Sequence, residues 1–364
     1  MTVFVIATAL QMGGAVTIFR QFLSHLAERA QGDRYVLFVN DRLPQLPIPG
    51  VEYVLLPILP KFRRIMSEVP ALRREAKRLG VKPDVVLSLQ NSGYSCFGDC
   101  PQIVYYHQAL PLYPGRYVPL NRQDNYLFFY KHVFPRWVRR TWTPTTRFVV
   151  QTEVVKQRFS RLYSIAPDRV VVCFPDIERI DAESVSGHVW GDDYHHLLFV
   201  GDDSSYRNGR LLIRAMALLH TTHPDLAARV RIHITASRSC APKMWAEAQR
   251  QGVVANVLFD GAIPHSELLS RYKTATALLF PSRIETIGLA ALEAAVFGLP
   301  VISIDADYAR YVLRDYEGVS FVPDGDCAAW AQAMADVCLA TPRHRPLSPY
   351  RQTEWGRLFD LIKA

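Results

Sequence analysis

Two glutamates, Glu285 and Glu293, stand eight positions apart at what the sequence predicts to be the start of a helix. Thr286 is predicted as the N-cap, and Gly288 allows the backbone to come close to a ligand. Free amides at a helix start attract phosphate. At a rise of 1.5 Å per residue the carboxylates are about 12 Å apart along the axis, which suits a ligand with hydroxyls at both ends and a pyrophosphate between them. The pair predicts a nucleotide-sugar site, with two solvated glutamates on a capped helix as the alternative.

Five further residues follow predicted strands, and α/β proteins bind their ligands at the carboxyl ends of parallel strands. Gly13 and Gly14 form a turn that phosphate can approach, although the turn lacks the GxGxxG fingerprint and a plain tight turn is an alternative. His107 can bind a sugar hydroxyl, assist proton transfer or serve the structure alone. Arg207, just before a helix, can neutralise a departing diphosphate. Ile263 can pack on the ring of a base.

No cluster of His, Cys, Asp and Glu has metal-ligand spacing. The carboxylate pairs Asp202-Asp203 and Asp305-x-Asp307 are more typical of turns and caps, with a metal-dependent Asp-x-Asp sugar transferase as the alternative. We therefore expect no metal site, and the only small molecule implied by the paired glutamates is a nucleotide-diphosphate sugar, bound as a substrate rather than as a cofactor.

Short apolar, β-branched runs alternate with helical patterns along the whole chain, which predicts an α/β fold of two doubly wound domains facing each other across a cleft. The predicted strands are 2–7, 35–39, 51–56, 85–89, 103–106, 148–151, 196–200, 230–235, 257–259, 277–280 and 301–304. The predicted helices are 14–29, 209–220, 241–251, 265–274, 289–297 and 353–363. We place a first domain at 1–176, a second at 177–345, and a C-terminal segment at 346–364 that packs back across the cleft; the family resemblance given below implies acceptor binding for the first domain and donor binding for the second.

Composition is that of a soluble globular protein: 49% of the 364 residues are hydrophobic and 21% are charged. No apolar run reaches the roughly 18–20 residues of a membrane span, and the N-terminus lacks the basic flank of a signal peptide. Six cysteines without paired CxxC spacing predict free thiols in a reducing cytoplasm.

The first half of the chain carries the positive charge. Residues 1–176 hold 23 Lys and Arg against 12 Asp and Glu, a net charge of +11, whereas residues 177–364 have a net charge of −3. The excess gathers at 61–64, 73–78 and 131–142, where cations alternate with Trp and Phe. This pattern favours an anionic membrane surface; solvated basic helices are an alternative. Nucleic acid is disfavoured because no recognisable module for it is present. The predicted location is the cytoplasm, with peripheral attachment to the inner face of the membrane.

With these residues in place, the chain resembles the retaining glycosyltransferases of the GT-B fold, specifically family four. The segment from Glu285 through Glu293, Ala294 and Gly298 to Pro300 looks like the Glu-x7-Glu signature of that family. The resemblance extends to Gly13-Gly14, His107, Arg207-Asn208, Leu211-Leu212-Ile213-x-Ala215 and the stretch 150–157.

The resemblance implies roles for each matching residue. Glu285 holds the hydroxyls of the donor sugar, Glu293 holds the ribose, and His107 faces the donor sugar. The implied catalytic set is His107, Arg207 and Glu285. The implied donor-binding set is Gly13, Gly14, Gly201, Asn208, Ile263, Thr286, Ile287, Gly288, Leu289 and Glu293.

Three positions depart from the family pattern. Arg207 replaces the usual lysine, which keeps the positive charge but exchanges a compact ammonium group for a planar guanidinium. Asp202 stands where many members carry a second phosphate-binding arginine, so the diphosphate site is expected to be less cationic. Ile287 replaces a common phenylalanine, which alters the shape of the loop.

The function implied is transfer of a sugar, with retained anomeric configuration and no obligatory metal, from a nucleotide-diphosphate sugar to a hydroxyl. The expected acceptor is a saccharide, lipid-linked, in the synthesis of a bacterial surface polysaccharide such as lipopolysaccharide. A nucleotide-sugar epimerase of the same architecture and a non-catalytic nucleotide-sugar binding protein are the alternatives.

Overall fold

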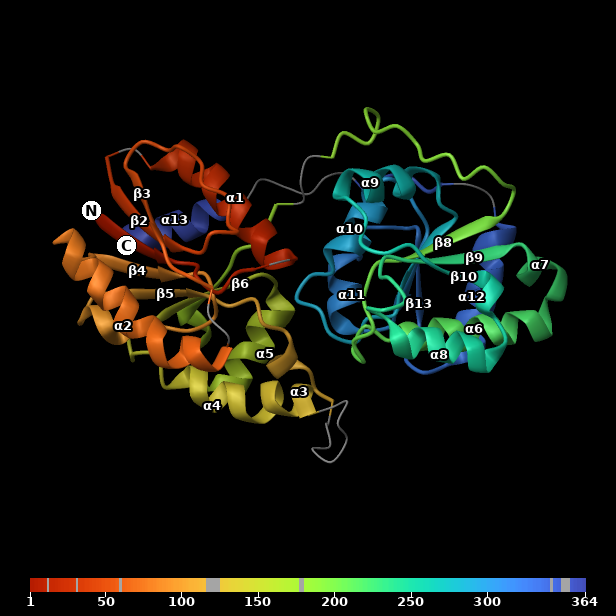
Figure 1. Ribbon diagram of the computed structural model, residues 1–364, viewed down its shortest axis with the longest axis horizontal. Helices are drawn as coiled ribbons and strands as arrows, with labels where there is room; N and C mark the ends of the chain where they lie inside the picture. Colours follow the sequence, from red (N-terminus) through yellow and green to blue (C-terminus); the bar gives the residue numbers. More distant parts are fainter. Residues whose placement is uncertain are drawn as a thin grey trace. The chain divides into compact units, whose positions relative to one another are not determined.

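The computed structural model describes residues 1–11, 13–30, 32–58, 61–115, 125–176, 180–340, 343–347 and 354–364; the side chains of 61–66 are not among the parts described. The chain divides into two compact units (Figure 1). The first contains Met1–Asp176 and Gln352–Ala364, and the second contains Ile177–Arg351.

The first unit is built on a seven-stranded parallel sheet in the order β3-β2-β1-β4-β5-β6-β7. Its strands are β1 Thr2–Ile6, β2 Arg34–Val39, β3 Val51–Leu55, β4 Val85–Ser88, β5 Gln102–Tyr105, β6 Arg147–Val150 and β7 Val170–Val172. Its helices are α1 Gly14–Arg29, α2 Lys61–Leu79, α3 Asn125–Phe128, α4 Phe134–Arg139, α5 Glu153–Tyr163 and α13 Trp355–Lys363. A π-helical turn, Phe129–Val133, joins α3 to α4.

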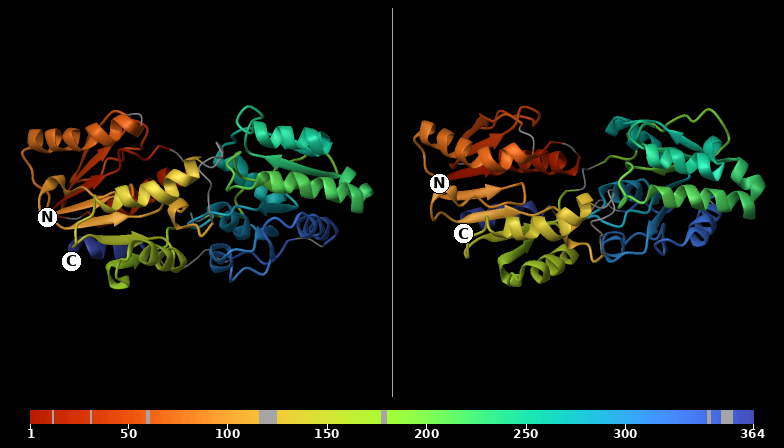
Figure 2. Two further views of the ribbon diagram at one scale, coloured as in Figure 1. Left: turned by 90° about the horizontal axis from the view of Figure 1, so that it is seen from below. Right: turned by 60° about the horizontal axis from the view of Figure 1, so that its bottom comes forward.

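Residues alternate between the two faces of β1, and each face has its own apolar layer. Val3 and Val5 belong to the layer formed with α1 and α13, whereas Phe4 and Ile6 belong to the layer on the opposite side. Helices therefore cover both faces of the first sheet, as Figure 2 shows.

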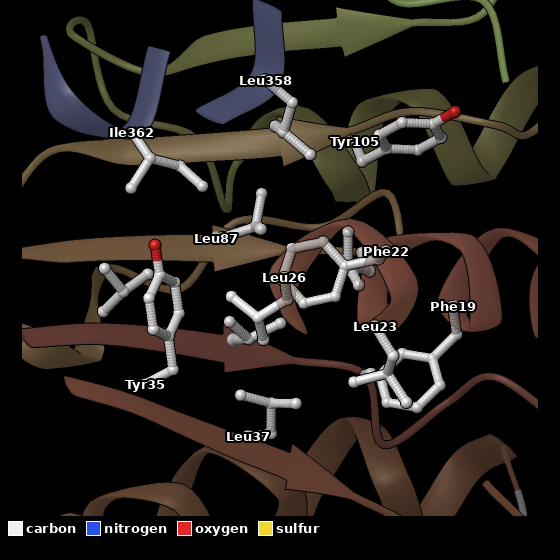
Figure 3. Close-up of a cluster of buried hydrophobic side chains, with 14 of the residues drawn as sticks. Phe19, Phe22, Leu23, Leu26, Tyr35, Leu37, Leu87, Tyr105, Leu358 and Ile362 are labelled. Atoms are coloured by element: carbon white, nitrogen blue, oxygen red, sulfur yellow. The ribbon is translucent and has the colours of Figure 1, made fainter. Parts of the chain in front are cut away.

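The helix α13 follows the whole second unit in the chain and completes the core of the first. Figure 3 shows side chains of both helices in one buried cluster, Leu358 and Ile362 of α13 and Phe22 and Leu26 of α1. Trp355 is fully buried in the same cluster.

The second unit has a six-stranded parallel sheet in the order β10-β9-β8-β11-β12-β13. Its strands are β8 His195–Phe199, β9 Val230–Ile234, β10 Val257–Phe259, β11 Ala277–Phe280, β12 Val301–Ile304 and β13 Val319–Val322. Its helices are α6 Gly209–Thr222, α7 Pro224–Ala228, α8 Pro242–Gln251, α9 His265–Thr274, α10 Leu289–Val296, α11 Asp307–Val312 and α12 Cys327–Leu339. The predicted α/β class with two doubly wound parallel sheets is confirmed.

A row of polar groups fixes the segment before β8 to the second unit. His196 Nδ1 lies 2.9 Å from His233 Nε2, Asp192 Oδ1 lies 2.8 Å from His196 Nε2, and Asp260 Oδ2 lies 2.9 Å from His233 Nδ1. Trp190 stacks on His196 with ring centroids 4.0 Å apart. A hydrogen bond between two imidazoles needs one ring nitrogen without a proton, so at least one of the two rings is neutral.

Candidate functional site

The loops that follow β8 and β11 meet where the order of the second sheet reverses. The two strands are neighbours, but β9 and β10 extend the sheet beyond β8, whereas β12 and β13 extend it beyond β11. Open α/β sheets bind ligands at the carboxyl ends of the strands beside such a switch point. The backbone N–H of Arg283 donates to the carbonyl of Tyr206 at 2.8 Å, which joins the two loops directly.

Arg207 and Glu285 form an ion pair across this switch point. Their side chains are 29% and 16% exposed, so the pair is accessible only in part. The guanidinium of Arg207 also lies 5.5 Å from the ring centroid of Tyr206. The structure thus brings together two of the three predicted catalytic residues.

Burial raises the pKa of Glu285, although Arg207 and a hydrogen bond from Ser282 oppose the shift. Ser282 is itself held, because the hydroxyl of Tyr308 donates to its carbonyl oxygen. Glu285 is therefore a carboxylate whose ionised form depends on the cation beside it.

The helix α10 begins at Leu289, and its N-cap is Gly288 rather than the predicted Thr286. Gly288 has φ 83°, and a Cβ at this position would lie 2.8 Å from Phe280 Cζ, so both conformation and space require glycine. No side chain caps this end. Thr286 and Leu289 are half-buried beside it, whereas Ile287 is buried and packs inward.

Glu293 lies on α10 and meets α9. Its Oε1 lies 3.1 Å from Nε2 of His265, the first residue of α9. His265 immediately follows the loop that carries the half-buried Ile263. Sequence reasoning missed His265, although a histidine at the start of a helix after this loop was a usable signal.

A third loop, after β13, reaches the same site through Asp324. Its Oδ2 accepts from Arg283 Nε at 2.7 Å, and its Oδ1 accepts from Asn208 Nδ2 at 3.2 Å. Asn208 is the N-cap of α6 in the left-handed conformation, with φ 62°. Sequence reasoning found Asn208 but missed Asp324 and Arg283.

Gly201 follows β8 and lies close to the side chain of Phe199. A Cβ at Gly201 would lie 2.9 Å from Phe199 Cζ. The Gly201 amide donates to Thr235 Oγ1 at 3.2 Å. This amide therefore holds the loop to the next strand.

Gly13, Gly14 and His107 belong to the first unit, after β1 and β5. Gly13 is exposed with φ 63° at the N-cap of α1, and no atom lies within 4 Å of where a Cβ would be at either glycine. The His107 amide donates to Asn91 Oδ1 at 2.8 Å. Burial lowers the pKa of His107 to about 4, so its imidazole is neutral near pH 7.

A cavity of about 250 Å³ opens at the carboxyl edge of the first sheet. Glu68 of α2 lies in its wall and accepts from Thr8 Oγ1, from Gln90 Nε2 at 3.0 Å and from Tyr94 Oη at 3.0 Å. The residues that line the cavity are Thr8, Leu56, Pro57, Ser67, Glu68, Pro70, Ala71 and Arg74. A carboxylate fixed by three donors beside apolar walls is suited to a hydroxylated ring.

The segment that contains the basic stretch 131–142 has some side chains at the surface and others in the core. Tyr126, Phe129 and Val133 are exposed on the α3–α4 segment, together with Arg136, Arg139 and Arg140. Trp142 instead packs against Phe148 and Tyr163. The side chains of the predicted basic cluster at 61–64 are not among the parts described.

Within the described part of the chain, no group of three or more His, Cys, Asp or Glu side chains is arranged to hold a metal ion. In the same residues, no helix combines the length and the apolar character that crossing a bilayer requires.

Two family models match the chain. The model described as "Glycosyltransferase Family 4" matches residues 12–178, and the model described as "Glycosyl transferases group 1" matches residues 194–339.

Curated relatives share parts of the sequence. A D-inositol 3-phosphate glycosyltransferase of Acidothermus cellulolyticus is 30% identical over 52% of this chain and 44% of its own length. D-inositol 3-phosphate glycosyltransferase 1 of Catenulispora acidiphila is 31% identical over 52% of this chain and 48% of its own length. The chain spans about half the length of the curated relatives that it matches.

Solved structures share the fold over nearly the whole chain. WaaG, a glycosyltransferase involved in lipopolysaccharide biosynthesis, superposes with a TM-score of 0.68 over 93% of this chain and 91% of its own, at 16% identity. HepE of Anabaena, in complex with UDP and glucose, superposes with a TM-score of 0.62 over 92% of this chain and 89% of its own, at 13% identity. Both units have the architecture of the GT-B glycosyltransferases, and the chain belongs to glycosyltransferase family four.

Proposed function

We propose that this protein is a retaining glycosyltransferase that moves a sugar from a nucleotide-diphosphate sugar to a hydroxyl of a saccharide acceptor. The observation that carries the proposal is the Arg207–Glu285 pair at the switch point of the second sheet, with Glu293 on the adjoining helix. A cation and a carboxylate at one sheet edge, with a second carboxylate on the adjoining helix, match the phosphate and hydroxyl groups of such a donor.

In this proposal, residues of the second unit hold each part of the donor. Glu285 accepts from hydroxyls of the sugar, and Glu293 accepts from the ribose. The diphosphate lies near Arg207 and the uncapped start of α10, where the backbone amides and the helix dipole favour anions. The base packs beside Ile263.

In the proposed reaction, the bond between the anomeric carbon and the diphosphate oxygen breaks, and a bond from that carbon to the acceptor oxygen forms on the same face. The acceptor proton passes to an oxygen of the departing diphosphate. Arg207 stabilises the negative charge that develops there. His107, neutral because of its lowered pKa, accepts or donates one hydrogen bond to the donor sugar without adding charge.

The acceptor would bind to the first unit. Its cavity offers the fixed carboxylate of Glu68 to hydroxyls and apolar walls to a ring. The exposed aromatic and basic side chains of the α3–α4 segment suit an anionic bilayer, which supports a lipid-linked acceptor in surface-polysaccharide synthesis at the inner face of the membrane.

The donor half is tested by incubating the purified chain with UDP-, GDP- and dTDP-sugars and a panel of acceptors, and by measuring release of nucleoside diphosphate. D-inositol 3-phosphate, named for the relatives, belongs in that panel. We expect Glu285→Gln to lose about 10²-fold or more in turnover, whereas Glu183→Gln, an exposed glutamate of the same unit, keeps the rate.

Full turnover by Glu285→Gln would contradict the assignment, and conversion of the donor to a second nucleotide sugar without acceptor would favour an epimerase. Retention is checked by the anomeric configuration of the product in NMR spectra. The proposal also requires that excess EDTA leaves the rate unchanged.

The membrane half is tested by flotation with vesicles of neutral lipid and with vesicles containing about one-third anionic lipid. We expect binding to the anionic vesicles alone, and loss of binding when Arg136, Arg139 and Arg140 are changed to glutamine. Each surface cation contributes about 1 kcal/mol to such binding. Equal flotation of the wild-type and triple-variant chains would overturn this part.

A further inference from the structure

We propose that Arg283 is a second cation for the diphosphate of the donor, and that Asp324 is the positioning residue that aims it. The inference rests on the proposed function and adds to it a residue that decides between diphosphate and monophosphate ligands.

The loops at the switch point of the second sheet contain more carboxylates than cations, so binding of a diphosphate there calls for a second cation. The loops 200–208, 281–288 and 323–326 contain Asp202, Asp203, Glu285, Asp324 and Asp326. They contain only two cationic residues, Arg207 and Arg283. Because Glu285 already neutralises Arg207, one guanidinium alone gives little net attraction for a multiply charged diphosphate.

The backbone brings Arg283 beside Arg207. The N–H of Arg283 donates to the carbonyl of Tyr206, the residue before Arg207, at 2.8 Å. The two arginines therefore start from adjoining backbone segments, one on each side of the sheet's switch point.

Asp324 fixes the direction of the Arg283 side chain. One carboxylate oxygen accepts from Arg283 Nε at 2.7 Å, and the other accepts from Asn208 Nδ2 at 3.2 Å. Asn208 is the N-cap of α6 and follows Arg207 in the chain. The carboxylate thus links the guanidinium to the start of α6, directly after Arg207 in the chain.

The bond to Asp324 uses the Nε–H, and a guanidinium carries five N–H donors in a rigid fork, so one arginine can join a carboxylate and a phosphate. The side chains of Arg283 and Asp324 are 34% and 39% exposed. Ion pairs this exposed contribute little to folding stability. The main effect of the contact is therefore to orient the side chain of Arg283.

The test compares nucleoside diphosphate with nucleoside monophosphate by isothermal titration calorimetry, with UDP and UMP, GDP and GMP, and dTDP and dTMP as probes. For the base that binds, we expect Arg283→Ala to weaken diphosphate binding about tenfold and monophosphate binding by about threefold or less. Arg283→Lys, which keeps the charge, should recover part of the loss. The matched control is Arg314→Ala, an arginine that is also 34% exposed and lies 3.5 Å from Asp315.

Two variants at Asp324 separate orientation from charge. Asp324→Asn keeps an oxygen that accepts from Arg283 Nε, so we expect diphosphate affinity at or above the wild-type value because a negative charge is removed. Asp324→Ala removes the acceptor, and we expect a loss of about threefold to tenfold that monophosphate binding does not share.

Equal losses for diphosphate and monophosphate in Arg283→Ala would assign the arginine a merely structural role and overturn the inference. An unchanged affinity for diphosphate would overturn it too. Either result leaves the proposed function intact, whereas a wild-type chain that binds none of the six nucleotides removes both. Thermal unfolding of each variant shows that it is folded.

Discussion

At the scale of single residues, Arg207 favours the ionised form of Glu285 and stays charged itself. Burial raises the pKa of Glu285, and Arg207 is the main group that opposes this rise. A donor phosphate that binds Arg207 must share the guanidinium with Glu285. The pair therefore couples the recognition of phosphate to the ionisation of the carboxylate that binds sugar hydroxyls.

This coupling predicts a change in the pH profile when the cation is removed. In Arg207→Ala the pKa of Glu285 rises further, so the ionised carboxylate is lost at a higher pH. We expect kcat/KM to fall about 10²–10³-fold near pH 7 and its acidic limb to move to higher pH than in the wild-type chain. Arg207→Lys should keep the wild-type limb. An acidic limb at the same pH in all three chains would contradict the coupling.

His107 gives a second prediction at this scale. Its pKa is about 4 in the folded chain, below the unfolded value of about 6.5, because burial disfavours the imidazolium. The resulting stability is fully present above about pH 6.5 and is lost as the pH falls through 4. We expect the His107 ring signal in NMR spectra to titrate near pH 4, and a midpoint near 6.5 would contradict the prediction. His107→Gln serves to assign the signal.

At the scale of elements, the apolar runs and helical patterns of the sequence located most of the fold. The helices α1, α6, α9 and α10 begin at the residues predicted for them, Gly14, Gly209, His265 and Leu289. The strands β7 and β13 were missed. β7 has only three residues, although Val170–Val172 is a β-branched run that could have indicated it, and in β13 only Val322 is buried.

The candidate site was predictable where a motif within one segment, or a position directly after a strand, gave a signal. Glu285, Gly288 and Glu293 share one stretch of sequence, so their spacing could be read. Asp324 and Arg283 are 41 residues apart and meet because the loops of β11 and β13 share one sheet edge. Thr286 was wrongly predicted as the N-cap because Gly288 adopts the left-handed conformation, which glycine enters without steric cost, and the helix begins after it.

Glu247 shows how two helices of the second unit are joined. It is buried on α8 and accepts from Arg214 of α6 at 2.8 Å and from Gln251 at 3.1 Å. Burial alone would raise its pKa, but hydrogen bonds from Arg250 and Arg214 lower it to about 2. This contribution to stability is present above about pH 4.5 and is lost as the pH falls through 2.

Glu247→Ala should therefore destabilise the second unit by about 1–2 kcal/mol at pH 7, which lowers its melting temperature by about 3–6 °C. The difference from the wild-type chain should shrink towards pH 2. Calorimetric melts at pH 7 and pH 3 measure this trend. Glu317→Ala, an exposed glutamate of the same unit, is the control, and an equal shift in that variant would contradict the role of the network.

At the scale of the whole molecule, the second unit lies in the sequence between two parts of the first. The ring of Trp355 stacks on Tyr105 of β5, with centroids 5.8 Å apart and planes 10° apart. Its indole N–H donates to Gln21 Oε1 at 3.3 Å. The core of the first unit thus depends on residues that follow the second.

Trp355→Ala is therefore expected to destabilise the first unit by about 3–5 kcal/mol and to leave the second unaffected. Hydrogen exchange followed by mass spectrometry resolves the two, because peptides of the first unit should exchange faster and peptides of the second should not. Leu339→Ala, at a side chain that is 70% exposed, should change neither. Equally faster exchange in both units would contradict the division.

Because α13 packs on the first unit but is made after the second, it also determines which unit can finish folding first during synthesis on the ribosome. Domains generally fold from the N-terminus as the chain emerges, yet the first sheet here lacks one of its covering helices until residues 355–363 have been made. The second unit can finish folding before the first does. Until then, the apolar face shared by Phe22 and Leu87 stays partly uncovered, and nascent chains halted before Trp355 should be the species that chaperones bind.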